Sequence, residues 1–102
     1  MYEMNGYVYA GNPKKIPRII HAEARENHVI IAQFNDGEIR SYDCTELLDL
    51  PIFAPLKDEQ AFMQMTLFYG APTWFDGDID IAPELIYDNG EVLPEWPEIL
   101  PA

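Results

Sequence analysis

The chain has 102 residues, 48% of them hydrophobic, which supports one modest folded core and excludes a disordered chain. Its net charge is −12, and residues 43–102 carry the whole excess, which excludes a phosphate-backbone binding surface in that part. No apolar run approaches the roughly 18 residues that cross a bilayer, and the N-terminus lacks the pattern of a secretory signal, so we expect no membrane association.

Cysteine usage indicates a reducing compartment. Cys44 is the single cysteine, so no disulfide can form within the chain. This usage is typical of the cytoplasm, where we expect the protein to be located. His21 or His28 could in principle act as the base for a Cys44 nucleophile, but nothing in the spacing supports it. We therefore expect Cys44 to be a small packing residue.

The first part of the chain predicts a short extension followed by a strand. Residues 1–16 place glycines and a proline around "YVYA", which predicts an N-terminal extension or an edge strand. Residues 17–90 have the pattern of a single α+β domain. Apolar side chains alternate in residues 18–25, so we expect a strand with Ile20, Ala22 and Ala24 on one face and residues 19, 21, 23 and 25 on the other.

A hairpin is the clearest predicted element. The alternating runs "VIIAQF" and "EIRSYD" flank "NDG", and Asp-Gly is a strong signal for a type I′ turn because both central residues need positive φ. A two-residue loop at Asp36 and Gly37 would pair Phe34 with Ile39. With the preceding strand, the hairpin predicts a three-stranded antiparallel meander.

Short helices and strands follow. "CTELLDLP" predicts a helical turn capped by Thr45, and "LKDEQAFMQM" predicts a short helix with Asp58 as its N-cap. "TLFY" and "TWF" predict strands separated by a break at "GAP". "PELIY" predicts another short helix with Pro83 in its first position, ended by a left-handed Gly90.

Four acidic residues form the first candidate site. Asp76, Asp78 and Asp80 are spaced two apart, and Glu84 follows one helical turn later. The stretch could be a metal cage, an acidic contact face or the solvated side of a strand. A calcium loop would need glycine at its sixth position, where this stretch has isoleucine, so we expect no metal. Alternation predicts a solvated strand face, and an acidic contact face stays open.

Two tryptophans form the second candidate site. Residues 91–102 predict a proline-rich acidic tail, either loose or extended over the surface with Trp96 and Leu100 as anchors. Trp74 and Trp96, with Phe75, are candidate aromatic contacts, because aromatics are enriched in the cores of interfaces. Packing within the domain is the favoured interpretation for Trp74 and Phe75, whereas both interpretations stay open for Trp96.

The order of these landmarks resembles the small bacterial family of domain of unknown function 2442. The resemblance covers roughly residues 17–88, although "TWFDGD" departs from the family's usual tryptophan-proline-asparagine-glycine. It implies an α+β fold with a small antiparallel sheet and two or three short helices, and no catalytic residues. It also suggests a two-protein system of toxin–antitoxin style. The matching residues are Phe34, Asp36, Gly37, Asp43, Phe53, Leu56, Asp58, Phe62, Trp74, Gly77, Asp80, Pro83, Leu85 and Tyr87.

The functional expectation is a non-catalytic module that binds a small, basic protein partner through the acidic part of the chain. The alternative is an enzyme or small-ligand-binding domain with a pocket between sheet and helices. No phosphate loop, zinc pattern or nucleophile motif is present, so we expect no cofactor. Direct DNA binding would depend on Lys14, Lys15 and Arg18, which are too few to favour it.

Overall fold

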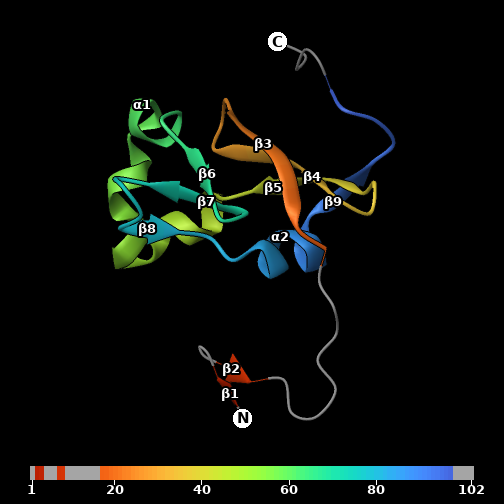
Figure 1. Ribbon diagram of the computed structural model, residues 1–102. Helices are drawn as coiled ribbons and strands as arrows, with labels where there is room; N and C mark the ends of the chain where they lie inside the picture. The colour runs from red at the N-terminus through yellow and green to blue at the C-terminus, as the bar shows by residue number, and fades with distance from the viewer. Residues whose placement is uncertain (1, 4–6, 9–16, 98–102) are drawn as a thin grey trace.

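The computed structural model describes residues 2–3, 7–8 and 17–97 of the chain (Figure 1). Strands β1 (Tyr2–Glu3) and β2 (Tyr7–Val8) pair antiparallel, and most of the predicted N-terminal extension otherwise lies outside the described residues. The remaining strands form two antiparallel sheets of four and three strands, accompanied by short helices. The predicted α+β class is therefore confirmed.

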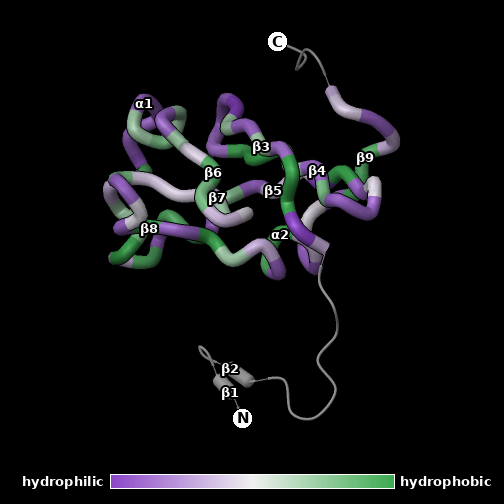
Figure 2. The backbone as a smooth tube through the Cα atoms, viewed as in Figure 1, coloured by the Kyte–Doolittle hydropathy of each residue, from purple (hydrophilic) through white to green (hydrophobic). Residues whose placement is uncertain are grey.

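The larger sheet contains the predicted meander and one further strand. Its order is β3-β4-β5-β9, and the added strand pairs with β5 at the edge of the sheet. Strand β4 lies in the interior of this sheet, between β3 and β5. Its hydrophobic, β-branched residues, coloured green in Figure 2, suit that position. The strands are β3 (Ile19–Arg25), β4 (Val29–Phe34), β5 (Ile39–Asp43) and β9 (Glu91–Leu93).

The β4–β5 hairpin exists, but its predicted register is wrong by one residue. Gln33 faces Ile39, whereas the sequence predicted Phe34 opposite Ile39. The loop has three residues, because Phe34 N–H donates to the Glu38 carbonyl at 2.8 Å and Gly37 N–H donates to the Phe34 carbonyl at 2.9 Å. Gly37 has φ 94°, as expected for the residue that ends a three-residue hairpin loop.

Strand β3 departs from the predicted alternation at its start. The pairing of β3 with β4 shifts between Ile19 and His21, so the extra residue changes which side chain faces the core. Ile19 is buried and Ala22 and Ala24 pack against the core, whereas Ile20 is 55% exposed. The prediction that Ile20 shares a face with Ala22 and Ala24 is therefore wrong.

The predicted helical turns are present, with different ends. Thr45 is not the cap of the first helix, because the Asp43 carboxylate accepts from the Thr45 N–H at 2.9 Å and the Thr45 hydroxyl at 2.6 Å. Pro51 was expected to end the first helical turn, but it is the first residue of a second helix. The Asp58 cap is confirmed by its bond to Gln60 N–H at 3.1 Å. The elements are the 3-10 helices η1 (Thr45–Asp49) and η2 (Pro51–Lys57) and helix α1 (Glu59–Phe62).

The smaller sheet leads into the last helix. Gly90 ends that helix with φ −77°, so the predicted left-handed conformation is wrong. Glycine is required for another reason, since a Cβ there would lie 2.6 Å from the Ile86 carbonyl oxygen. The sheet order is β6-β7-β8. Its strands are β6 (Thr66–Phe68), β7 (Ala71–Trp74) and β8 (Ile79–Asp80), and the helix is α2 (Pro83–Asn89).

One core joins both sheets and the helices. Trp74 lies in it with its ring stacked on Phe62 at 5.5 Å, and its indole N–H donates to the Phe62 carbonyl at 2.8 Å. This bond satisfies the one polar group of a side chain that is 1% exposed. The core residues are Ile19, Ile30, Ala32, Phe34, Cys44, Leu48, Leu56, Phe62, Trp74, Ile79, Ile81 and Ile86.

Candidate interaction surface

Both turns of the smaller sheet present an aromatic side chain from a strained backbone. Phe68 pairs with Ala71, so Tyr69 and Gly70 form a two-residue loop, and their φ values of 51° and 78° are those of a type I′ turn. In the β7–β8 turn, Phe75 has φ 55°. Positive φ is a genuine outlier for a bulky residue, and asparagine or glycine would relieve the strain.

These aromatic side chains are in solvent. Tyr69 is 93% exposed, Phe68 58% and Phe75 50%. The rings of Phe68 and Tyr69 contact each other, with centroids 4.4 Å apart. Neither burial nor turn geometry accounts for these side chains, which is typical of residues kept for binding rather than for folding.

The four acidic candidates border these aromatics. Asp76, Asp78 and Asp80 are exposed, whereas Glu84 in α2 is half-buried. Asp80 pairs with Thr73 and follows the buried Ile79, so by alternation its side chain lies on the outer face of the smaller sheet. Asp78 lies in the turn that precedes β8. Within the part of the chain that the structure describes, none of the four carboxylates forms an ion pair.

Two hollows connect the acidic residues to the aromatic ones. Asp76 lines one of them together with Phe68. Glu84 lines the other together with Tyr69 and with Arg18, although Glu84 and Arg18 form no ion pair. We call the combined region the aromatic–acidic surface. It consists of Phe68, Tyr69, Phe75, Asp76, Asp78, Asp80 and Glu84.

The structure does not bring the two candidate tryptophans to this surface. Trp74 is buried in the core, so it is not available to a partner. Trp96 lies on the far side of the larger sheet, where its ring packs on His21 with centroids 4.6 Å apart. Arg25 Nη2 donates to the Pro97 carbonyl at 2.8 Å, which fixes the chain beside Trp96 across this sheet.

A second concave region lies between β5, η1 and α2, where the alternative hypothesis placed a pocket. It is an open groove of about 630 Å³. Burial is the main cause that raises the pKa of Tyr42, with the neighbouring thiol and carboxylates adding to it. Three of its lining residues are acidic and none of those described is basic. The lining residues are Ser41, Tyr42, Asp43, Thr45, Glu46, Leu47, Leu85, Asn89 and Glu91.

The groups that could support nucleophilic or metal chemistry are engaged in structural roles. Burial raises the pKa of the Cys44 thiol to about 12, so its thiolate is scarce near neutral pH. His28 Nε2–H donates to the Leu56 carbonyl at 2.8 Å. Among residues 17–97 and the four described residues before them, no three histidine, cysteine or acidic side chains are placed to hold a metal ion.

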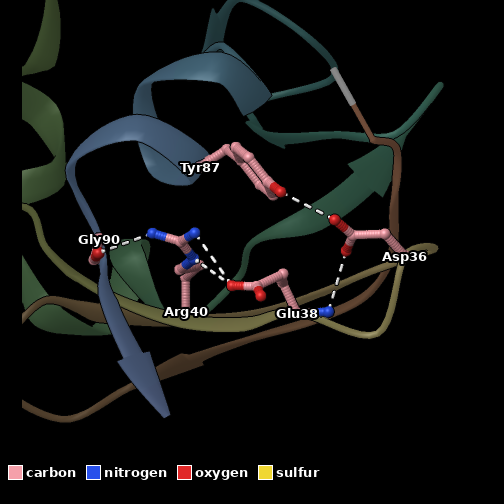
Figure 3. Close-up of polar contacts among 5 residues, drawn as sticks. All are labelled: Asp36, Glu38, Arg40, Tyr87 and Gly90. Atoms are coloured by element: carbon pink, nitrogen blue, oxygen red, sulfur yellow. Dashed lines mark hydrogen bonds and ion pairs between the residues drawn. The ribbon is translucent and has the colours of Figure 1, made fainter. Parts of the chain in front are cut away.

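A polar cluster holds α2 against the β4–β5 hairpin (Figure 3). Tyr87 O–H donates to Asp36 at 2.8 Å, and the Arg40 guanidinium lies 4.7 Å from the centre of the Tyr87 ring. Arg40 also bonds to Glu38 and to the Gly90 carbonyl. Every charged group in the cluster has a partner within it, so we interpret the cluster as structural.

Sequence reasoning missed Phe68 and Tyr69 as candidate binding residues. "TLFY" was interpreted as a strand and "GAP" as a break, whereas the turn is at Tyr69 and Gly70. The available signal was glycine preceded by an aromatic residue where asparagine or aspartate is the usual choice.

Comparison with known protein families identifies a match over most of the chain. The family described as "Protein of unknown function (DUF2442)" matches residues 19–91, more than two thirds of the chain. No curated protein and no solved structure matches. In the described part of the chain, no helix combines the length and the apolar character needed to cross a membrane.

Proposed function

This chain belongs to the DUF2442 family, and from its surface we propose that it is a non-catalytic module that binds a basic protein partner in the bacterial cytoplasm. The binding region is the aromatic–acidic surface. A paired system of toxin–antitoxin style, or an inhibitor that mimics nucleic acid, would be a special case of this function.

One observation carries the proposal: exposed aromatic side chains on and beside strained turns lie next to carboxylates that form no ion pair within the described residues. Aromatic residues supply much of the energy at interface centres, whereas rim charges choose the partner and speed the encounter. The net charge of −12 favours a basic partner.

The second candidate function is binding of a small cationic ligand in the groove between β5, η1 and α2. Its location and its three carboxylates support this alternative. It ranks second because the groove is open to solvent. Acidic side chains are also common over this chain, so three of them in one groove do not distinguish it.

The test is co-purification with the products of neighbouring genes. The four-site variant Asp76→Asn, Asp78→Asn, Asp80→Asn and Glu84→Gln should lose most of the bound partner. High salt should have the same effect, since the screening length falls from about 8 Å at 0.15 M to about 3 Å at 1 M. The matched control changes four other carboxylates, Glu26→Gln, Asp49→Asn, Asp88→Asn and Glu95→Gln, all of them exposed. Equal loss in both variants, or binding insensitive to salt, would contradict the proposal.

A further inference from the structure

We propose that one hollow in the aromatic–acidic surface receives an arginine side chain of the partner, an inference that rests on the proposed function. The hollow lies on the outer face of β6 and β7 and has a volume of about 220 Å³. Sites for whole small molecules are larger, roughly 300–1,000 Å³, so this space suits a single side chain. We call it the threonine hollow. Its lining residues are Thr66, Phe68, Thr73, Asp76 and Gly77.

The hollow contains a fixed pair of hydroxyl groups. Thr66 and Thr73 are directly opposite on β6 and β7, and their Oγ1 atoms are 3.1 Å apart. Thr73 Oγ1 also donates to the Thr66 carbonyl at 3.2 Å. Thr73 is only 4% exposed, so its hydroxyl is held in place by the sheet.

The protons of both hydroxyls are used within the sheet. A hydroxyl has a single proton, and that of Thr73 is donated to the Thr66 carbonyl. The bond between the two hydroxyls is therefore donated by Thr66 Oγ1. Only lone pairs remain to face the hollow, so the hydroxyl pair accepts hydrogen bonds from a ligand and donates none.

The other lining groups require a cationic donor of planar shape. Asp76 lines the hollow and supplies a carboxylate, from a backbone that is left-handed with φ 56°. Phe68 supplies a largely exposed aromatic ring. A guanidinium group can stack on a ring, pair with a carboxylate through two parallel bonds and donate to a hydroxyl at the same time. An ammonium group is a point charge and lacks this planar match, so arginine is preferred to lysine.

Binding of a single amino-acid derivative tests the hollow without the partner. Titration of the folded ¹⁵N-labelled protein with N-acetyl-arginine methylamide should shift the amide signals of Thr66, Phe68, Thr73 and Gly77 in a saturable, millimolar transition. The lysine counterpart should bind at least about three-fold more weakly, because its ammonium group has neither the forked N–H donors nor the planar surface of a guanidinium group. Asp76→Asn should weaken the arginine response by about five-fold or more.

Controls separate the hollow from general acidity. Asp88→Asn changes the net charge equally at an exposed site in α2 and should leave the titration unchanged. Thr66→Val, which keeps the shape but removes the hydroxyl acceptor, should weaken it. Equal responses to arginine and lysine, or an undiminished response in Asp76→Asn, would overturn the proposal.

Failure of the hollow and failure of the proposed function give different results. Suppose that the four-site variant loses the partner, that Phe68→Ala and Thr66→Val retain it, and that the arginine derivative gives no saturable shift. This combination would overturn the role of the threonine hollow and leave the proposed function standing. A wild-type protein that binds no basic neighbour would contradict the proposed function whatever the titration shows.

Discussion

The Tyr87 phenol and the Asp36 carboxylate, 51 residues apart in the sequence, are joined by a 2.8 Å hydrogen bond. The same carboxylate accepts from Glu38 N–H at 2.9 Å. The Tyr87 ring also meets Phe34 edge-on, with centroids 4.9 Å apart. The contact thus joins the tip of the β4–β5 hairpin to α2, the helix that carries Glu84 of the aromatic–acidic surface.

This contact should make stability depend on pH at the acidic end. The Glu38 N–H lowers the pKa of Asp36 below its ordinary value of 3.8, and the Tyr87 phenol adds to the effect against partial desolvation. A lowered folded pKa gives stabilisation that is present above pH 3.8 and is lost as pH falls through the folded value. Urea unfolding between pH 2 and 6 should therefore show a shallower acidic decline in Asp36→Asn than in the wild type. Asp88→Asn is the control, and an identical decline in all three proteins would contradict the prediction.

Tyr87, the other side chain of this hydrogen bond, should make stability depend on pH at the alkaline end. The hydrogen bond to Asp36 is the main cause that raises the pKa of Tyr87 above 10.0, and desolvation adds to it. The resulting stabilisation is present below pH 10.0 and is lost as pH rises through the folded value. Tyr87→Phe should flatten this alkaline decline in thermal unfolding. An unchanged slope between pH 9 and 11 would show that the phenol is not held as described.

Replacement of the buried tryptophan should cost far more than replacement of the half-buried one. Trp74→Phe leaves a void and an unpaired Phe62 carbonyl in the core, so it should lower the free energy of unfolding by about 2–4 kcal/mol. Trp96→Phe keeps a ring against His21 and should cost under about 1 kcal/mol. Urea denaturation of both variants checks the difference, and comparable losses would contradict the placement of Trp74.

The strained turn should show a trade between stability and binding. Tyr69→Asn restores the asparagine-glycine pair that a type I′ turn favours, so it should raise the free energy of unfolding by about 1 kcal/mol. It also removes a side chain that is 93% exposed, and it should weaken partner binding. Calorimetry measures the first effect and co-purification measures the second. Lower stability in this variant would contradict the argument that the aromatic residue is kept for binding.

The buried thiol should be inert until the protein unfolds. Burial, with the charge of Asp43 as a smaller cause, raises the pKa of Cys44 to about 12. At pH 8 a disulfide reagent should therefore react with the folded protein at least about 100-fold more slowly than in 6 M guanidinium chloride. Rapid stoichiometric reaction of the native protein would show that the thiol is accessible.

Local signals predicted most elements of the fold. The alternation of "DIDI" predicted that Ile79 and Ile81 face the core, and they are 6% and 2% exposed. The errors occurred where one additional residue, in a loop or a bulge, changes the register of a strand pair. Asp-Gly suits both two-residue and three-residue loops, so the sequence could not decide the pairing of Ile39. A bulge between Ile19 and His21 is likewise set by pairing with β4 and leaves no mark on β3 alone.

The candidate surface was harder to predict than the strands that carry it. Alternation predicted that Asp78 and Asp80 lie in solvent, because that property depends only on the local stretch "DIDI", of which Ile79 and Asp80 form β8 and Asp78 ends the preceding turn. The meeting of Phe68 with Asp76 depends on the register of β6 against β7 and on the shape of two turns. Such contacts arise from tertiary arrangement, so a single sequence does not specify them.

Strand β9 covers the edge of β5 through three paired residues. Only its first residue, Glu91, lies within the stretch that matches the family. A chain shortened to end at Gly90 would leave β5 with a bare row of N–H and C=O groups. Bare strand edges are templates for intermolecular pairing, so the shortened protein should form fibrous or amorphous deposits that the longer chain resists.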